Sequence, residues 1–468
     1  MSDLFPLPLA PFEEYLLLDD RPGYRMCFLV EQSFDGEIDR AAFDVGVAEA
    51  SRRHPLLNAV AQHRRFRGWR WNSAGDVPPV IDWASMDQPL IFPKEMGIDL
   101  TQEKGVRFFV RVGNGHSRLV TQFHHACCDG MGAIQYLSDV FAAYTRELYP
   151  HAAKHPAYRP VEALHLLRRG DLQVHQDKSM SRFRLFLRLL AYARHYAAQP
   201  PMPLASSRTS SAGGTPLSYP GTLTRTFSPS VQNDLRRVAR RSDVTVNEIL
   251  VRELMLTIRD WNQRHSTVRD TDQISIRVPT NLRNLDHDHM PSANLVGLVA
   301  FQRSVAELSQ PEKLLESIKA ESRFYKRWRF GAAFLDGLKV VRWIPGALRR
   351  IVNSKHSFGS AILSCIGDPS LAISANFPVN EDGNPIFGNL VFHDMNTAPP
   401  IRPQTHASFT TWHFSNKMRI GVRCDSEIFT QESAQELLDL FANRVVNVAN
   451  SETQRREVAR VARSRVQP

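Results

Sequence analysis

The stretch HHACCDG, residues 124–130, lies between two different patterns of apolar residues. The residues before it, Arg118–Phe123, have the composition of a strand. The residues after it predict an amphipathic helix over 131–148, because one face of such a helix would carry Met131, Ile134, Leu137, Phe141, Tyr144 and Leu148. The stretch is therefore expected where a strand ends and a helix begins, which is where α/β sheets usually present catalytic groups.

The two histidines of this stretch, His124 and His125, are candidates for acid–base chemistry. A histidine whose pKa is near neutrality can take a proton from an alcohol or an amine and return one to a leaving thiolate. That is the chemistry of acyl transfer from a thioester. The competing interpretation is two partly buried polar residues at a strand end. The full pattern His-His-x-x-x-Asp-Gly between a strand and an amphipathic helix favours the catalytic interpretation.

Asp129 and Gly130 complete the stretch. Asp129 can orient the turn by pairing with an arginine elsewhere in the chain, and Gly130 permits a sharp change of backbone direction. Two histidines and two cysteines this close together also raise the question of zinc, but zinc sites usually need a second, distant pair of ligands. The sequence contains no such pair, so Cys127 and Cys128 are interpreted as small apolar fillers of the turn and no metal is expected.

The length of 468 residues predicts two lobes, since single domains cluster near 100 to 200 residues. The segment QPPMPLASSRTSSAGGTPLSYPG ends at residue 221, is rich in Pro, Ser and Gly, and is typical of a crossover between lobes. We therefore expect an N-terminal lobe over 1–200 that carries HHACCDG, a linker over 201–221 and a C-terminal lobe over 222–468.

Both halves alternate strand-like and helix-like patterns, which predicts an α/β layer fold. Capping signals support two of the helices, at Asp39 and at the pair Thr245 and Glu248. Strands are predicted at 24–34, 106–112, 118–123, 223–227, 273–278, 295–301, 361–366, 371–377, 386–392, 408–414 and 418–424. Helices are predicted at 39–54, 131–148, 230–241, 245–264 and 430–450, with a polar and basic tail after Ser451.

Composition narrows the class of protein. Apolar residues make up 43% and charged residues 23%, as in a folded globular chain. The start has no basic n-region, and no stretch approaches 18 uncharged apolar residues, so we expect neither a secretory signal nor a spanning helix. Five irregularly placed cysteines fit a reducing cytoplasm, which is the expected location. The net charge of +10 suits anionic lipid, coenzyme A phosphates or an acidic carrier protein; the scattered arginines argue against nucleic acid.

The HHACCDG stretch and several segments around it resemble the coenzyme A-dependent acyltransferase superfamily. That superfamily includes chloramphenicol acetyltransferase, the condensation domains of nonribosomal peptide synthetases and wax ester synthases. The similar segments span most of the chain: GEIDRAAFDVGVAEASRRHPLLNA (36–59), IDLTQEKGVRFFV (98–110), VPTNLR (278–283), NLVGLVAF (294–301) and FTQESAQELLDLFANRV (429–445).

The resemblance implies two chloramphenicol acetyltransferase-like lobes that form a V with a central active-site tunnel. It also implies His125 as general base, His124 as a supporting residue, Asp129 as a structural residue and Arg283 as its salt-bridge partner. Gly130 would let a donor thioester approach. Arg277 is the alternative partner for Asp129, and the Pro-x-Asn-x-Arg context favours Arg283. Catalysis would need neither a metal nor a covalent acyl-enzyme, and no permanently bound cofactor: acyl-CoA or an acyl-carrier-protein thioester would be the co-substrate.

Two features leave the substrates open. The Asp-Phe-Gly-Trp-Gly segment of the plant-type branch is missing, and Ile386–Asn389 is at most a faint echo of it. Two basic amphipathic stretches, 178–199 and 324–355, pack on a lobe, lie on an anionic membrane surface or cover the mouth of an apolar channel. Together they favour a lipid-like substrate and peripheral membrane contact. The alternatives to an acyltransferase are a stand-alone condensation enzyme that joins two carrier-bound substrates and a catalytically silent binding protein of the same fold.

Overall fold

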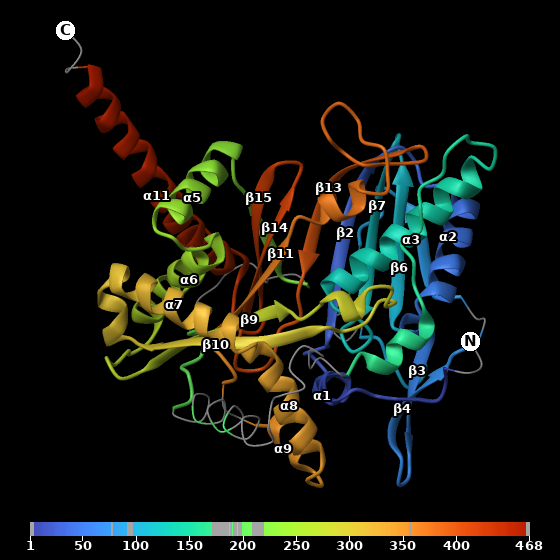
Figure 1. Ribbon diagram of the computed structural model, residues 1–468, viewed down its shortest axis with the longest axis horizontal. Helices are drawn as coiled ribbons and strands as arrows, with labels where there is room; N and C mark the ends of the chain where they lie inside the picture. The colour runs from blue at the N-terminus through green and yellow to red at the C-terminus, as the bar shows by residue number, and fades with distance from the viewer. Residues whose placement is uncertain are drawn as a thin grey trace.

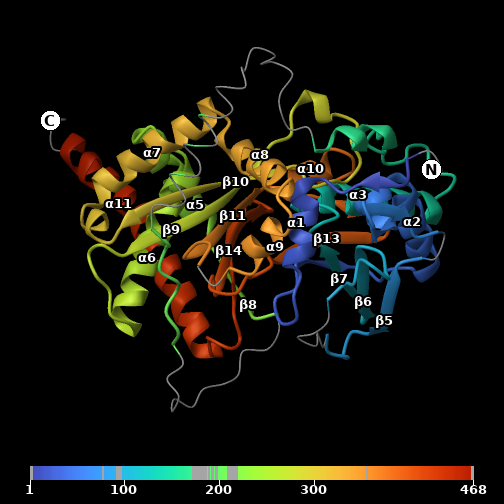
Figure 2. The same ribbon diagram turned by 90° about the horizontal axis from the view of Figure 1, so that it is seen from below.

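The computed structural model describes residues 4–75, 78–90, 97–170, 199–207, 220–354 and 357–464, together with Leu187, Leu190 and Arg194, and the backbone alone over 452–464. Within this part of the chain, two six-stranded sheets stand side by side, each with helices packed against it (Figure 1 and Figure 2). No helix of the described part is long and apolar enough to cross a membrane. The architecture is α/β with two lobes, as predicted.

The first sheet has the strand order β12-β13-β2-β7-β6-β5. Strand β7 lies in its interior and pairs antiparallel with β2 and β6, so the residues that follow β7 emerge from the middle of the sheet. Helices α2 and α3 cover one face of this sheet, and their apolar stripes join its buried side chains in one core (Figure 1). The elements are β2 Cys27–Asp35, α2 Arg40–Arg53, β5 Val80–Ser85, β6 Val106–Gly113, β7 His116–His124 and α3 Gly130–Leu148.

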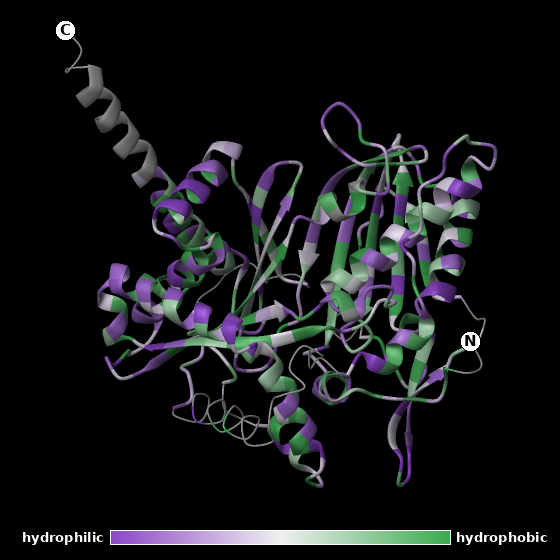
Figure 3. Cartoon of the chain, viewed as in Figure 1, coloured by the Kyte–Doolittle hydropathy of each residue, from purple (hydrophilic) through white to green (hydrophobic). Residues whose placement is uncertain are grey.

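The second sheet has the order β10-β9-β11-β14-β15-β8, and a second core lies between it and α5, α6, α7 and α11. Apolar residues concentrate where strands and helices face each other, and polar residues on the outer helix faces (Figure 3). The elements are β8 Thr222–Thr226, α5 Pro229–Arg241, α6 Val246–His265, β9 Gln273–Asn281, β10 Val296–Ser304, α7 Pro311–Arg327, β11 Ala361–Gly367, β14 Ala407–Phe414, β15 Lys417–Cys424 and α11 Gln431–Ser464.

Two strands from the C-terminal half complete the first sheet. Strand β13 (Leu390–Ala398) pairs antiparallel with β2, and β12 (Ile386–Phe387) pairs with β13. The predicted range 222–468 for the C-terminal lobe therefore includes a segment that hydrogen-bonds in the sheet of the N-terminal half. An apolar strand pattern predicts that a segment joins a sheet, but it does not show next to which strand the segment will lie. The linker range 201–221 stays a prediction, because residues 208–219 lie outside the described part.

Three further expectations are wrong in detail. The predicted strand 371–377 is the helix α10 (Pro369–Ser374), because the Asp368 side chain caps it and Pro369 suits its first turn. The predicted strand 386–392 is a hairpin that turns at Gly388, whose φ of 61° favours glycine. Helix α11 does not end near residue 450 but continues to Ser464.

The remaining predicted strands and helices are present within a few residues of their expected bounds. Unpredicted elements are β1 Leu7–Pro8, α1 Pro11–Asp19, β3 Ala59–Arg64, β4 Gly68–Ser73, β5 Val80–Ser85, α7 Pro311–Arg327, α8 Phe330–Arg342, α9 Ala347–Val352 and the 3-10 turns Pro55–Asn58, Ala163–Arg168, Leu285–His287 and Ala306–Ser309. Of the two basic amphipathic stretches, 178–199 lies almost wholly outside the described residues. The other, 324–355, is formed largely by the end of α7 and by α8 and α9.

Candidate active site

The HHACCDG stretch connects β7 to α3 and so lies where the middle of the first sheet meets the second half of the chain (Figure 1). His124 is the last residue of β7, and Asp129 is the N-cap of α3. The Asp129 carboxylate accepts a hydrogen bond from the Gly132 amide at 2.9 Å, which is the usual N-cap contact. The local sequence thus produces the predicted strand, turn and helix.

His125 is held by its backbone and by one side chain from the other half of the chain. Its amide donates to the Met26 carbonyl at 2.7 Å, and its own carbonyl accepts from the Asn294 amide at 2.7 Å. The imidazole Nδ1 lies 3.3 Å from Asn294 Nδ2, and Phe28 packs edge-on against the ring with centroids 5.2 Å apart. These contacts hold the imidazole ring of His125 in one orientation.

The environment of His125 favours the neutral ring. Burial lowers its pKa below the ordinary value of 6.5 and outweighs nearby backbone hydrogen bonds and the charge of Asp129, which act in the opposite direction. The ring also hydrogen-bonds to the backbone of His125 and Cys128. With its proton on Nδ1, the neutral imidazole keeps the lone pair of Nε2 for a substrate proton. The arrangement can therefore accept a proton at neutral pH.

His124 has a different environment and cannot share this role. Its side chain is fully buried, and Nδ1 accepts a hydrogen bond from the Ala126 amide at 3.1 Å. Burial, followed by the neighbouring charges of His125 and Arg25, lowers the pKa of His124 to about 3. The ring is therefore neutral at physiological pH, carries its proton on Nε2, and holds the turn through its hydrogen bond with the Ala126 amide.

Asp129 and Arg283 form a bidentate ion pair across 154 positions of sequence. Arg283 Nη1 and Nη2 each lie 2.8 Å from a carboxylate oxygen of Asp129. The Leu295 amide donates to the same carboxylate at 2.9 Å. Burial by itself raises the pKa of Asp129, but Arg283 and the two backbone amides outweigh it and hold the pKa below its usual range. The alternative partner, Arg277, lies elsewhere: its guanidinium donates to the Phe358 carbonyl and stacks over that ring.

A buried network fastens the loop 292–295 to the first half of the chain. His54 Nδ1 accepts from the Ser292 amide at 2.9 Å, and its Nε2 lies 3.1 Å from Asp139, which also accepts from Arg53. Burial, as the largest cause, lowers the pKa of His54, so the ring is neutral with one acceptor and one donor nitrogen. Because residues 293–295 contact Asp129 and His125, this network positions the loop that holds the candidate base.

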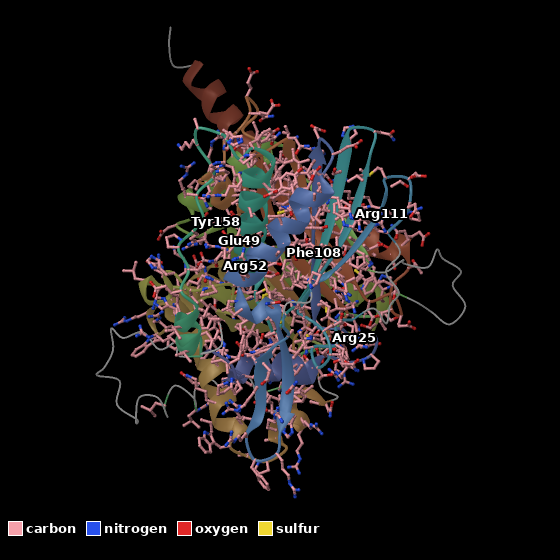
Figure 4. The ribbon with its side chains drawn as sticks, turned by 90° about the vertical axis from the view of Figure 1, so that its right-hand side faces the viewer. Arg25, Glu49, Arg52, Phe108, Arg111 and Tyr158 are labelled. Atoms are coloured by element: carbon pink, nitrogen blue, oxygen red, sulfur yellow. The ribbon has the colours of Figure 1, made fainter. Side chains whose placement is uncertain are left out.

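Close packing explains the small residues of the turn. Cys127 and Cys128 are fully buried, and burial raises the pKa of both thiols. A Cβ on Gly105 would come within 2.2 Å of the Cys127 sulfur. Cys127 therefore fills space beside β6 and Cys128 fills space beside Gly132 in α3, which agrees with their interpretation as apolar fillers. Further from the turn the surface is ordinary: on the outer face of α2, for example, Glu49 pairs with Arg52 (Figure 4).

Two adjoining cavities lie near the site, and one of them reaches the start of α3. One, of about 320 Å³, is lined by Asp129 and Gly130 from the first half and by residues of β9, β11 and β14, including Asn281 and His413. The other, of about 430 Å³, shares Asn281 and Arg283 with it and extends to Lys326 and Arg329 on α7 and its C-terminal end. Gly130 has no positive φ and begins the helix, and a Cβ there would meet nothing within 4 Å. Gly130 therefore does not form the predicted sharp turn; it is the first residue of α3 and lines a cavity.

The predicted site residues lie together, and the structure adds others. His124, His125, Asp129, Gly130 and Arg283 all lie at the junction of β7 and α3. Sequence reasoning assigned no role to Asn294, Ser292 or His54. Asn294 is the first residue of NLVGLVAF, and His54 belongs to Arg-His-Pro in the segment 36–59. Both segments carry the family resemblance, but the sequence does not show which residues these two side chains contact.

Comparison with known proteins agrees with this architecture. No family model matches the sequence. An uncharacterized protein of Mycobacterium tuberculosis, present in two strains, is 26% identical over 314 residues, which are 63% of this chain and 68% of that protein.

Three solved structures share the fold over nearly the whole chain. The starter condensation domain of rhizomide synthetase in complex with C8-CoA has a TM-score of 0.66 at 13% identity, with 96% of each chain covered. The epimerization domain of tyrocidine synthetase B gives 0.65 at 12% identity over 96% of each. Polyketide synthase associated protein 5 from Mycobacterium tuberculosis gives 0.61 at 14% identity over 95% of this chain and 98% of that one. The chain therefore shares the fold of these condensation and epimerization domains and of polyketide synthase associated protein 5.

Proposed function

We propose that this protein is an acyltransferase that moves an acyl group from a thioester to a hydroxyl or an amine, with His125 as the general base. The observation that carries the proposal is the state of His125. Burial favours its neutral ring, the ring hydrogen-bonds to the backbone of His125 and Cys128, and the Asn294 side chain holds the His125 carbonyl at the junction of the two lobes. A base prepared in this way needs little reorganisation when substrate arrives.

The reaction needs one proton to move twice. His125 Nε2 takes the proton from the acceptor hydroxyl or amine while the acceptor atom attacks the thioester carbonyl. The tetrahedral intermediate then collapses, the C–S bond breaks, and the imidazolium returns the proton to the leaving thiolate. In this scheme His124 and the Asp129–Arg283 pair are positioning residues, since they hold the turn without touching the reacting atoms.

The co-substrate in this proposal is acyl-CoA or an acyl-carrier-protein thioester, with a small-molecule or lipid-like acceptor. The cavity that ends at Lys326 and Arg329 places two cationic side chains near the site, and Lys326 lies 3.9 Å from Glu248 on the same wall; such cations suit a phosphate-bearing thioester. A second candidate is a stand-alone condensation enzyme that joins two carrier-bound substrates. It is favoured by the likeness of nearly the whole chain to synthetase domains.

A direct assay tests the proposal. The purified protein is incubated with acyl-CoA donors of increasing chain length and a panel of alcohols and amines, and free thiol and product mass are followed. We expect thiol release that depends on the acceptor and on His125. Turnover only with carrier-bound donors would select the condensation enzyme, whereas no turnover with either class of donor would contradict acyl transfer.

The pH dependence of the reaction should report the state of His125. A general base acts in its neutral form, so kcat/KM falls as the pH drops through its pKa. Because burial lowers the pKa of His125, we expect the acid limb of the profile to lie below pH 6.5, with full activity retained through neutrality. The profile is measured with an alcohol acceptor, which does not itself titrate in this range. An acid limb above pH 6.5 would contradict a buried neutral base.

Substitution of Asn294 should separate positioning from simple packing. Asn294→Ala removes the donor to the His125 carbonyl, and we expect kcat/KM to fall about tenfold or more. Asn294→Asp, of nearly the same size, places a carboxylate next to the ring and should raise the pKa of His125, moving the acid limb to higher pH. A purely structural role would lower activity without moving the pH profile, so an unmoved profile in Asn294→Asp would contradict the assignment.

A further inference from the structure

Two neighbouring protrusions at one edge of the molecule combine exposed apolar residues with arginines. The first is the hairpin of β3 and β4, and the second is formed by α8 and α9. Both descend from the same lower edge in the views of Figure 1 and Figure 4, away from the C-terminal helix α11. They lie against each other: a groove of about 450 Å³ is lined by His63 and Trp69 of the hairpin and by Arg342 and Leu348 of the helices.

The outermost residues of both protrusions are large and apolar. Phe66 at the hairpin turn is 93% exposed, and Trp343 between α8 and α9 is 88% exposed. Ile344, which follows Trp343, and Val340, one helical turn before Trp343, are also more than half exposed. Single exposed apolar residues are ordinary, but a Trp and a Phe at the tips of two adjacent protrusions form a patch that water solvates poorly.

Positive charge surrounds these tips. Residues 59–73 contain Arg64, Arg65, Arg67 and Arg70, residues 337–354 contain Lys339, Arg342, Arg349 and Arg350, and neither segment contains an Asp or a Glu. Arg342 is neutralised by Glu14 at 2.8 Å, and Lys339 by Asp336 at 3.5 Å. Among the described residues, Arg65, Arg67, Arg349 and Arg350 have no carboxylate within ion-pair distance. The basic edge, defined here as residues 64–67 and 339–351, thus carries uncompensated positive charge next to exposed aromatic rings.

We propose that the basic edge docks the protein on a membrane surface that contains anionic phospholipid. Arginines near such a surface are attracted by its negative potential, and Trp and Phe side chains enter the boundary between headgroups and acyl chains. Two projecting tips can insert together into a soft, planar surface. A folded acidic partner would instead need a complementary patch fitted around both tips, so a bilayer fits this convex edge better than a carrier protein does. The proposal does not depend on acyl transfer, because docking needs no chemistry at His125.

Vesicle sedimentation with the full chain tests the proposal without an activity readout. We expect the protein to sediment with vesicles of phosphatidylserine and phosphatidylcholine and to stay in solution with phosphatidylcholine alone. Arg349→Gln/Arg350→Gln should weaken binding about 25-fold, since each arginine near the surface contributes about fivefold. The matched control is Arg236→Gln/Arg240→Gln, which removes two exposed charges from α5 and should leave binding unchanged.

A second measurement locates the contact. Lipids brominated on their acyl chains quench tryptophans that enter the bilayer, so they should quench the protein's fluorescence, and Trp343→Phe should abolish most of that quenching while preserving an aromatic side chain. Equal loss of binding in the α5 control would show a response to net charge alone and would overturn the proposal. An absence of binding to anionic vesicles would also overturn the proposal. If Arg349 and Arg350 were then needed only for reaction with a carrier-bound donor, the basic edge would be a site for the carrier protein.

Discussion

His125→Ala is expected to lower kcat/KM for acyl transfer by about 100- to 10,000-fold, the range that a positioned general base contributes. The fold should survive, because the contacts that place this residue are made by its backbone amide and carbonyl, which alanine retains. The measurement is steady-state kinetics with saturating donor, together with thermal unfolding to show that the variant is folded.

The same strand supplies a matched control. His116 begins β7, is exposed and lies 3.2 Å from Asp35, so His116→Ala removes an imidazole from β7 at a distance from the site. We expect its activity to equal that of the unmodified protein. Full activity in His125→Ala would contradict the proposed mechanism. An unfolded His125→Ala protein would show that the imidazole side chain, and not only the backbone of residue 125, is needed for folding.

Asp129→Ala is expected to destabilise the protein by about 3–5 kcal/mol, the usual result of removing one partner from a buried ion pair. The Asp129 side chain is 2% exposed, and its loss would leave the Arg283 charge without its carboxylate partner and the amides of Gly132 and Leu295 without an acceptor. Urea unfolding followed by circular dichroism measures the effect. Activity should fall as well, since this pair joins the two lobes beside His125.

The pH dependence of stability has a defined sign here. The pKa of Asp129 is lower in the folded chain, so its contribution is present at neutral pH and is lost as the pH falls below about 4, the value of an unperturbed carboxyl. Arg52→Ala is the control, because it breaks an exposed pair with Glu49 that should contribute less than about 1 kcal/mol. If the Asp129→Ala protein were as stable as the Arg52→Ala protein, the buried Asp129–Arg283 pair would not stabilise the fold.

Signals confined to one segment predicted that segment well. The strand–turn–helix unit around HHACCDG follows from an amphipathic pattern and a capping Asp129, and the capping box of Thr245 and Glu248 begins α6 as expected. The segment 371–377 shows the limit of such signals. Its apolar residues suit a strand or a helix, and the cap at Asp368, just before it, decides for a helix.

The sequence by itself determined the local geometry of the turn and the chemistry that its side chains can perform, since both depend on residues within a few positions of each other. Tertiary structure decided which residues complete the site. Asn294 reaches His125, Arg283 reaches Asp129 and Ser292 reaches His54 across 154 or more positions of sequence, and strand β13 joins the sheet of the other half. A sequence pattern shows that a group will be buried or paired; only the folded chain, where the lobes meet, shows with what.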